Sequence, residues 1–555
     1  MLSTSNQSAS VKRQLNVVLP FIVLLFALST LANAATLPLA PQTFDTSYLP
    51  PAGATITVAA GGDLQAAINA AKPGDTIVVE AGASFTGPFV LPNKTGGNSW
   101  IYIRSSAYSN LPAPGTRVSP ANAASMPKLR VGAGGNSAIE TANGAHNFRF
   151  VGIEVLPVSG SWVTTLIMAG LGDTSVATLP RDIVFDRCYI HADATVGGRR
   201  GIAMNGIAIA VVDSYLSGFR EVGADTQAVW SYNGPGPLKV VNNYLEAAGE
   251  NLMIGGKAAG IVDVVPSDIE IRDNHFFKPL SWQNQNYTVK NLIEFKMGVR
   301  VLVANNKFEN NWPGAQVGFA VQITPRNEDS SAPWSAVTDL TFANNVIINS
   351  PQGINIAGED SNRYVIGTQY SSKRAERILI QNNLIVSSTA GITDGRLFQV
   401  LYGPKDLTID HNTAFADKAL IMAENIQQFK ADNFVFTNNI VSFGTGIAGT
   451  GSGGGTNTLT DQFTNWSLSK NAIVGIQEPP YSRSSYPTGN YWPADIAAVK
   501  FVGMGTGDYR LAADSPYKGM ATDGSDLGAN LQAGITFAPP QSGAAPGSPT
   551  NIQVN

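Results

Sequence analysis

A short pattern of apolar and polar positions recurs along most of the chain. Each copy has apolar residues on both sides of a polar pair that is rich in asparagine, as in residues 240–245, which read Val-Val-Asn-Asn-Tyr-Leu. Short runs of β-branched and aromatic residues are typical of strands. Asparagine favours a turn because it tolerates the left-handed backbone. Each copy therefore predicts a strand that bends at the polar pair and continues as a second strand.

The copies follow one another at irregular intervals of 27 to 39 residues. Strand units with a period in this range indicate a solenoid whose turns carry loops of different lengths. Successive turns lie about 4.8 Å apart, so asparagine amides at one corner can bond to one another in a ladder. We expect one solenoid of roughly a dozen turns over residues 60–535. The asparagines expected to stack along one corner are Asn243, Asn274, Asn306, Asn345, Asn383, Asn412 and Asn439.

The start of this region predicts a short helix before the first strand. Within residues 63–71, helical spacing places Leu64, Ala67, Ile68 and Ala71 on one face. Such a face is suited to covering the open end of a solenoid.

With this entry segment and the repeated asparagine corner, residues 60–535 resemble the right-handed parallel β-helix superfamily, which includes pectate, alginate and chondroitin lyases. The resemblance implies an all-β fold with an N-terminal capping helix. It also implies that a second strand in each turn lines a cleft for an extended polysaccharide.

Six segments between the corners are candidates for that second strand. In period two, their apolar residues point inward and their polar residues point outward. The outward residues are expected to form one polar column that binds substrate, and they are Asn251, Glu294, Lys296, Gln322, Thr324, Asn355 and Gln399. The alternative is an ordinary solvated sheet face.

Two aromatic residues near this flank are candidates for stacking against sugar rings. Trp230 and Tyr402 fall in what we interpret as loops beside the polar column. Each is equally consistent with a loop anchor that packs against the solenoid.

A lysine and an arginine on consecutive turns are the candidate catalytic pair. Residues 291–298 resemble the lyase segment that carries the base lysine, and residues 323–327 resemble the segment that carries the catalytic arginine. The resemblance implies that Lys296 and Arg326 are catalytic, with Glu294 and Gln322 orienting the substrate. The Asn-Lys-Ser and Arg-His-Gly triplets of those lyases are absent here. The alternative is a surface Lys–Glu contact and an arginine that closes a turn.

The amino-acid composition and charge limit the classes of molecule that the protein can bind. Hydrophobic residues make up 44% of the chain and charged residues 14%, which suits a large core. The net charge of −4 and the lack of a long basic cluster argue against a nucleic-acid partner. Cys188 is the single cysteine, so no internal disulfide can form. Three carboxylates near the polar flank are candidate ligands for a calcium ion, namely Glu221, Asp225 and Glu250.

The two ends of the chain have their own character. Residues 1–34 have the basic start, apolar run and small-residue site of a signal peptide, which predicts a protein that acts outside the cytoplasm, extracellular or periplasmic. A retained membrane anchor is the alternative, and no second segment is apolar enough to span a bilayer. Residues 35–59 are expected to be a leader. Residues 536–555 form a Pro/Gly/Ser-rich linker, whose last residues resemble the first strand of a fibronectin-III-like module.

The sequence favours a secreted protein that binds an extended acidic polysaccharide and cleaves it by β-elimination as a polysaccharide lyase. A non-enzymatic adhesin or glycan-binding structural protein is the alternative. A glycoside hydrolase ranks lower, because the clustered aspartates and Gly-His-Gly segment of polygalacturonases are missing. The sequence does not define an oligomeric state.

Overall fold

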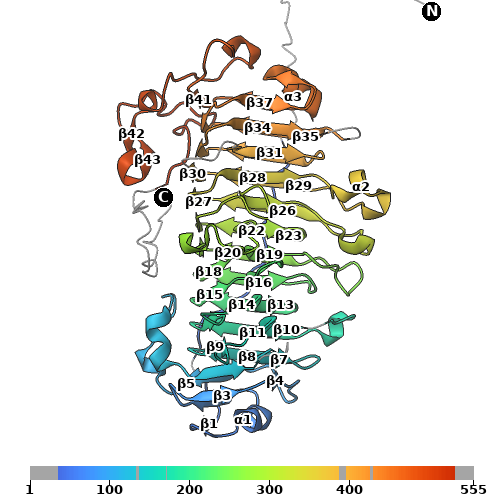
Figure 1. Ribbon diagram of the computed structural model, residues 1–555, viewed down its shortest axis with the longest axis vertical. Coiled ribbons are helices and arrows are strands. Elements are labelled where there is room, and N and C mark those ends of the chain that lie inside the picture. The colour runs from blue at the N-terminus through green and yellow to red at the C-terminus, as the bar shows by residue number, and fades with distance from the viewer. Residues whose placement is uncertain are drawn as a thin grey trace, which may run out of the picture.

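Three long parallel β-sheets wind around one axis and form the body of the molecule (Figure 1). The computed structural model describes residues 35–49, 51–132, 137–170, 172–386, 395–425 and 429–531. Along the body of the solenoid each turn adds one strand to each of the sheets, which we name A, B and C. This arrangement confirms the predicted all-β, right-handed parallel β-helix, and the 13 strands of sheet B agree with the expected dozen turns.

Sheet A holds the strands that precede the asparagine corner. Its neighbouring strands pair in parallel along the molecule. Its strands are β1 (Thr55–Val58), β2 (Thr76–Val79), β5 (Ile101–Ser105), β8 (His146–Val151), β11 (Arg181–Asp186), β14 (Ile207–Val212), β17 (Leu238–Val241), β20 (Ser267–Arg272), β23 (Gly298–Ala304), β26 (Val337–Ala343), β29 (Glu376–Gln381), β32 (Lys405–Asp410), β35 (Ala431–Thr437), β39 (Phe463–Thr464) and β40 (Ser467–Ser469).

Sheet B holds the short strands that follow the same corner. Its strands are β3 (Ser84–Thr86), β6 (Lys128–Val131), β9 (Glu154–Pro157), β12 (Tyr189–His191), β15 (Tyr215–Phe219), β18 (Tyr244–Ala247), β21 (His275–Phe277), β24 (Lys307–Glu309), β27 (Val346–Ile348), β30 (Leu384–Val386), β33 (Thr413–Phe415), β36 (Ile440–Ser442) and β41 (Ala472–Val474).

Sheet C contains the second strands predicted from the sequence. Its strands are β4 (Phe89–Leu91), β7 (Ile139–Thr141), β10 (Thr165–Ala169), β13 (Arg200–Met204), β16 (Gln227–Ser231), β19 (Glu250–Ile254), β22 (Ile293–Phe295), β25 (Phe319–Ile323), β28 (Gln352–Ala357), β31 (Phe398–Leu401), β34 (Ala419–Glu424), β37 (Gly446–Gly449) and β38 (Gly453–Gly454).

Apolar side chains from all three sheets meet inside the solenoid. One continuous buried cluster runs from Val58 near the first turn to Tyr486 beyond the last. Aromatic rings stack from turn to turn within it, as Phe276 and Phe308 do at 4.4 Å between ring centroids. Because successive side chains of a strand point to opposite faces of the sheet, every second side chain lies in this core and the others lie on the outer surface.

The asparagine ladder lies at the corner between sheets A and B. The carbonyl oxygen of the Asn345 side chain accepts from the backbone N–H of Asn306 at 2.9 Å and from its side-chain amide at 3.0 Å. The same contacts join the other predicted members, so the ladder is confirmed, and it extends to Asn471 and Asn490.

The two residues of each polar pair have different tasks at this corner. The first takes the left-handed backbone, with φ of 55° at Asn242 and 58° at Asn344. The second forms the ladder and is not among the residues with positive φ. The left-handed conformation that favours asparagine at this corner therefore belongs to the first residue of the pair and not to the ladder asparagine. In the earliest copy the pair is Arg187, with a φ of 51°, and Cys188, whose N–H donates to Ser214 Oγ at 2.9 Å.

The predicted capping helix is present as α1 (Leu64–Ala70) at one end of the solenoid (Figure 1). Its N-cap Asp63 accepts from the Ala66 N–H at 2.8 Å, and Leu64, Ala67 and Ile68 are buried. The first strand of sheet A, β1, falls inside the range expected to be a leader. The solenoid therefore begins about five residues earlier than predicted.

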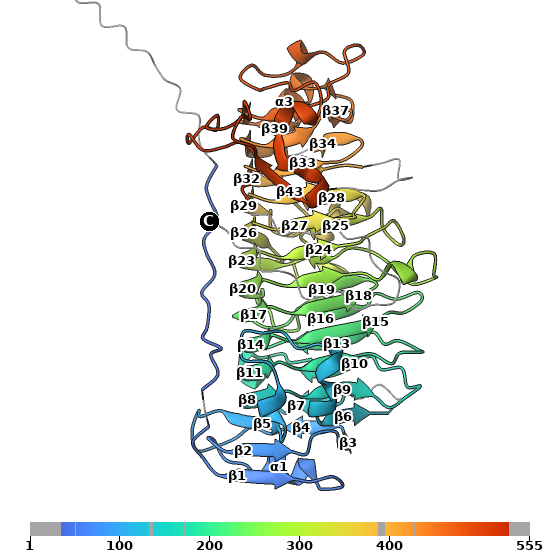
Figure 2. The same ribbon diagram turned by 90° about the vertical axis from the view of Figure 1, so that its left-hand side faces the viewer.

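Residues 35–49, which we call the strap, run along the outer face of sheet A (Figure 2). Their backbone bonds to side chains of turns far apart in the sequence, from Arg149 to Asp406. The leader predicted from the sequence is thus an ordered part of the surface.

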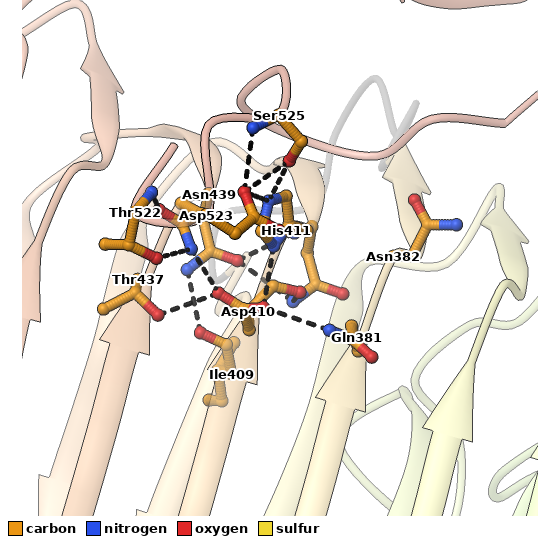
Figure 3. A network of polar contacts seen from close by, with 12 residues as sticks. Gln381, Asn382, Ile409, Asp410, His411, Thr437, Asn439, Thr522, Asp523 and Ser525 are labelled. Carbon is orange, nitrogen blue, oxygen red and sulfur yellow. Dashed lines mark hydrogen bonds and ion pairs between the residues drawn. The ribbon is translucent and has the colours of Figure 1, made fainter. Parts of the chain in front are cut away.

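The C-terminal segment folds back onto the ladder corner. After the hairpin of β42 (Phe501–Gly503) and β43 (Asp508–Leu511), it reaches His411, whose Nδ1 lies 2.7 Å from Asp410 Oδ2 and whose Nε2 lies 2.9 Å from Ser525 Oγ (Figure 3). Asn438 also bonds to Thr522 in both directions. Within the described ranges the two remaining α-helices are α2 (Asn362–Val365) and α3 (Thr456–Gln462).

The predicted signal peptide over residues 1–34 and the predicted linker over residues 536–555 lie outside the described residues. Among the residues that are described, no helix combines the length and apolar character required to cross a bilayer.

Candidate functional site

The outer face of sheet C carries a polar row in register across consecutive turns. Strand pairing aligns Glu294 on β22 with Gln322 on β25, Asn355 on β28 and Gln399 on β31. The alternate residues of these strands, such as Ile293 and Phe295, lie in the core. The predicted column therefore exists for these four side chains, which we call the polar row.

Members of the polar row bond to one another along the solenoid axis. The Asn355 side-chain amide donates to Gln322 Oε1 at 2.5 Å, and the Gln399 amide donates to Asn355 Oδ1 at 3.0 Å. Glu294 accepts from the Asn291 amide at 3.2 Å. Glu294, Gln322 and Asn355 are 3%, 7% and 8% exposed, so this row is a closely bonded surface with little free area.

A half-buried charged cluster lies where the strands of sheet C end. Lys296 Nζ is 3.1 Å from Glu328 Oε1, and Arg326 Nη1 is 2.6 Å from Asp360 Oδ1 and 2.7 Å from Ser361 Oγ. The side chains of Lys296 and Arg326 are 17% and 28% exposed. We call Lys296, Arg326, Glu328 and Asp360 the charged cluster.

Backbone pairing holds the two predicted catalytic residues on neighbouring turns of the same flank. The Arg326 N–H donates to the Lys296 carbonyl oxygen at 2.9 Å. Their side chains take separate acidic partners rather than turning toward each other. Thr324, two residues before Arg326, is buried, and its N–H donates to the Phe295 carbonyl oxygen at 2.9 Å.

The electrostatic surroundings keep Lys296 protonated. Burial by itself would lower the pKa of Lys296, but the carboxylates of Glu294, Glu328 and Glu250 outweigh it and raise that pKa. In the free protein this side chain is an ammonium, which suits binding a carboxylate or donating a proton. It does not suit the role of a base that must first be neutral.

The three carboxylates considered for calcium do not form a metal site. Asp225 Oδ2 lies 2.5 Å from the ammonium of Lys290, which is also 3.6 Å from Glu250 Oε1. Glu221 has a buried carboxylate oxygen with no hydrogen-bond partner among the residues that the structure describes. Across the described ranges, no group of three or more His, Cys, Asp or Glu side chains is arranged to hold a metal ion. The lysine takes the place that a cation would need, so these residues do not fit calcium.

Glu250 is fully buried at the start of β19. It accepts from the Gln227 amide at 2.7 Å, and Gln227 accepts in turn from Arg200 Nε at 2.7 Å. Burial, reinforced by the charges of Glu294 and Asp225, raises the pKa of Glu250 to about 7.

The prediction that Asn251 points outward is wrong. Asn251 is fully buried, and its amide donates to the carbonyl oxygens of Leu245 at 2.7 Å and Phe277 at 2.8 Å. It occupies the bend between sheets B and C, where strict alternation of faces stops. Its Oδ1 accepts from Lys278, a fully buried lysine that also donates to three backbone carbonyls.

The two candidate aromatic residues are not open platforms. Trp230 lies in β16 rather than in a loop, is 6% exposed, and donates through Nε1 to the Gly255 carbonyl oxygen at 2.7 Å. It stacks on Tyr232 at 4.6 Å and under the Arg200 guanidinium at 4.1 Å. Tyr402 is half-buried and stacks on Tyr364 at 5.0 Å. Both pack as anchors.

Sequence reasoning missed the acidic partners of the charged cluster. Glu328 and Asp360 lie in the loops after β25 and β28, outside the alternating strand pattern that identified the others. The acidic residues that follow Arg326 and Ala357 within a few positions were the available indication.

A cavity of about 780 Å³ lies on a different flank. The strap, sheet A and the ladder corner line it, and none of the predicted site residues contributes. Two ion pairs are formed within its lining, between Arg149 and Asp186 and between Arg272 and Asp273.

No protein-family model and no curated protein sequence matches the chain. Solved structures are similar in shape. An alginate lyase from Paenibacillus sp. str. FPU-7 is 15% identical, covering 62% of this chain and 99% of its own, with a TM-score of 0.38. A mannuronic acid specific polysaccharide family 6 lyase from human gut microbiota is 12% identical, covering 79% and 91%, with a TM-score of 0.44. Pectate lyase Pel9A is 11% identical, covering 86% and 96%, with a TM-score of 0.36.

Proposed function

We propose that the protein binds an extended acidic polysaccharide along the outer face of sheet C and cleaves it by β-elimination at the charged cluster. The observation that carries the proposal is the Lys296–Glu328 ion pair beside Arg326, at the ends of β22 and β25. The pair supplies a proton donor and a proton acceptor, and the guanidinium supplies a permanent positive charge.

β-Elimination in a uronate chain has three chemical requirements. The proton next to the carboxylate must be removed, the carboxylate must be neutralised, and the leaving glycosidic oxygen must be protonated. Arg326 is suited to the carboxylate, because a guanidinium holds it in two places and stays charged. Its two bonds to Asp360 and Ser361 both use Nη1, and among the described residues Nη2 and Nε have no hydrogen-bond partner, which leaves them for a ligand.

Glu328 accepts the proton from carbon 5 of the uronate in this mechanism. The electrons of that bond form the C4–C5 double bond while the C4–O bond breaks, and Lys296 gives its proton to the leaving oxygen. The proton on Glu328 then returns to the neutral amine of Lys296, 3.1 Å away. No water or oxidant is consumed. The role given to Lys296 is thus that of the acid, in keeping with its raised pKa.

A polar row that repeats with every turn matches a polymer with repeating polar groups. Glu294, Gln322, Asn355 and Gln399 lead away from the charged cluster along the axis. Exposed edges of these side chains, together with Thr324, are the proposed contacts for neighbouring sugars. The signal peptide predicted from the sequence fits a glycan met outside the cytoplasm.

One observation favours a non-enzymatic glycan-binding or structural protein as the second candidate. The amides of the polar row satisfy one another and are at most 8% exposed from Glu294 to Asn355. Such a row stabilises the solenoid whether or not a ligand binds.

A panel of acidic glycans tests the proposal. Purified protein is incubated with polyuronates, glycosaminoglycans and a neutral glucan as control, and ultraviolet absorbance reports C4–C5 unsaturated products. Unsaturated ends from one acidic glycan are expected. Binding without unsaturated products would favour the second candidate, and absence of both from every acidic glycan would overturn the proposal.

A further inference from the structure

The strap is fastened to sheet A at regular intervals. The backbone N–H groups of Gln42, Leu39 and Thr36 donate to Oδ1 of Asp268, Asp339 and Asp406 at 2.9, 3.0 and 3.1 Å. The donors are three residues apart, and the acceptors are on β20, β26 and β32, which are two turns apart. The strap therefore runs antiparallel to the rise of the solenoid.

The distance between successive donors along the strap matches the distance between successive aspartates along the solenoid. Two turns of a β-helix rise about 9.6 Å. Three residues of polyproline II rise about 9.3 Å and complete one turn, so every third amide faces the same side. The strap has proline at positions 38 and 41, which fixes the backbone in this region of φ and provides no competing donor. A helix or a strand would fall out of register with the aspartates.

The aspartates are held ready for this contact. Each has a left-handed backbone, with φ of 58°, 56° and 52°. Arg300 binds Asp268 with two bonds of 2.7 Å, and Arg377 binds Asp339 with bonds of 2.7 and 2.9 Å. Asp406 has no such arginine among the described residues, and its Oδ1 accepts from the Asn433 amide at 2.8 Å. One oxygen of each carboxylate still accepts the strap amide.

Backbone bonds, rather than apolar burial, hold this upper part of the strap. The Leu37 and Leu39 side chains are 60% and 62% exposed. Lower down, Arg149 donates to the carbonyl oxygens of Thr46 and Ser47 at 2.9 and 3.1 Å, and Tyr48 stacks on Tyr108 at 5.5 Å. The recognition is therefore of an extended backbone with a three-residue period.

We propose that the outer face of sheet A is a binding site for a polyproline-II segment, and that the strap is the segment bound there. Turns of a solenoid touch only their neighbours, so each region can open by itself. A strap bonded from β8 to β32 joins turns that do not otherwise meet, and it makes their opening cooperative.

Two triple proline variants of the full chain test this. Thr36→Pro, Leu39→Pro and Gln42→Pro together remove the three bonded donors, while Leu37→Pro, Ala40→Pro and Thr43→Pro shift the same change by one residue. Within the described part of the chain, the amides of the control set make no hydrogen bond. A fluorescent peptide of residues 35–49 should bind the first variant by anisotropy, because its site is vacated. It should not bind the wild type or the control.

The first variant should also unfold in more than one step, whereas wild type and control unfold in one. Failure of the peptide to bind the first variant, or equal behaviour of the two variants, would overturn the proposal. Hydrogen exchange of the wild-type protein gives a test that needs no variant. The Thr36, Leu39 and Gln42 amides should exchange about fivefold or more slower than those of Leu37, Ala40 and Thr43. An even exchange rate across these six amides would also overturn it.

Discussion

Lys296 Nζ lies 3.1 Å from Glu328 Oε1, and the N–H of Arg326, two residues before that glutamate, donates to the carbonyl oxygen of Lys296 at 2.9 Å. The backbone bond fixes the spacing of adjacent turns, and the ion pair bridges it. The ion pair therefore holds a proton donor and a proton acceptor side by side. The proposed elimination uses both, since a proton is taken at one atom and delivered at another.

Two substitutions test the charged cluster once an active glycan is known. Lys296→Met should abolish elimination, because neither the proton donor nor the charge remains, and Glu328→Gln should lower kcat by about a hundredfold or more. Both variants should lose some stability, because the Lys296 and Glu328 side chains are only 17% and 24% exposed, so activity is compared at a temperature well below the melting temperature of each variant. Lys307→Met, on sheet B, is the matched control and should keep full activity. Wild-type activity in Lys296→Met would sink the mechanism.

The asparagine ladder predicts a position-specific stability loss. Asn345→Leu leaves the Asn306 N–H and amide without their acceptor and the Val303 carbonyl oxygen without its donor. The expected cost is roughly 1–3 kcal/mol, measured by denaturant unfolding. Asn344→Gly, at the preceding left-handed position, should cost less because glycine accepts its φ of 58°. A larger loss from Asn344→Gly would mean that the outer residue, not the ladder, carries the stability.

Much of the fold could be predicted because one local rule repeats. A strand, a polar pair and another strand recur from Ile183 to Val441, and each copy needs the same turn and the same buried amide. Repetition therefore made the ladder and sheet C visible. It could not assign the left-handed backbone within the pair, since asparagine suits both tasks and occupies both positions in Asn242-Asn243.

The site was less accessible to sequence reasoning where alternation ends. Asn251 stands one residue into β19, at a bend where two consecutive positions face inward, so counting by two gave the wrong face. Trp230 obeys the alternation, but its burial depends on the segment around Gly255, which the sequence does not place. The strap had no strand or helix pattern, because polyproline II bonds to side chains of distant turns rather than to itself.

The contacts of His411 predict that the attachment of the C-terminal segment to the solenoid depends on pH. Burial would lower the pKa of His411, but Asp410 outweighs it, and the net pKa is raised. The protonated form donates to Asp410 and Ser525, so this stability is fully present below about pH 6.5 and is lost as pH rises through the higher folded pKa. Asp410, whose pKa is lowered, titrates well below this range.

His411→Asn, which keeps a residue that tolerates φ of 51°, should remove this dependence. The melting temperature of the wild type, relative to the variant, should fall as pH rises above about 6.5. A constant difference over this range would show that the imidazole does not titrate against the C-terminal segment.

Export can be checked directly. The predicted signal peptide ends at Ala34, and the strap makes its first bond at Thr36. Mass spectrometry of protein recovered outside the cytoplasm should therefore find Met1–Ala34 missing and a chain that starts at or near Ala35. An intact N-terminus in the membrane fraction would favour the anchor instead.

Lys278 should be among the most sensitive positions, although it is far from any solvent. Its Nζ donates to the carbonyl oxygens of Ala247, Ala248 and Gly249 at 2.9, 2.9 and 2.7 Å and to Asn251 Oδ1 at 3.1 Å. Lys278→Met fills similar space but leaves four buried acceptors without a donor. The expected loss is about 3–5 kcal/mol in denaturant unfolding, against less than about 1 kcal/mol for Lys307→Met.

The pH dependence of that loss separates a charged lysine from a neutral one. Burial lowers the pKa of Lys278 to about 7, with the charge of Glu250 acting in the opposite sense. Since the unfolded chain binds this proton up to about pH 10.4, the lysine costs stability below pH 7 that is regained as pH rises toward 10. The stability difference between wild type and Lys278→Met should therefore widen from pH 7 to pH 10. A difference that narrows instead would show that the ammonium form is the one that the carbonyl cage stabilises most.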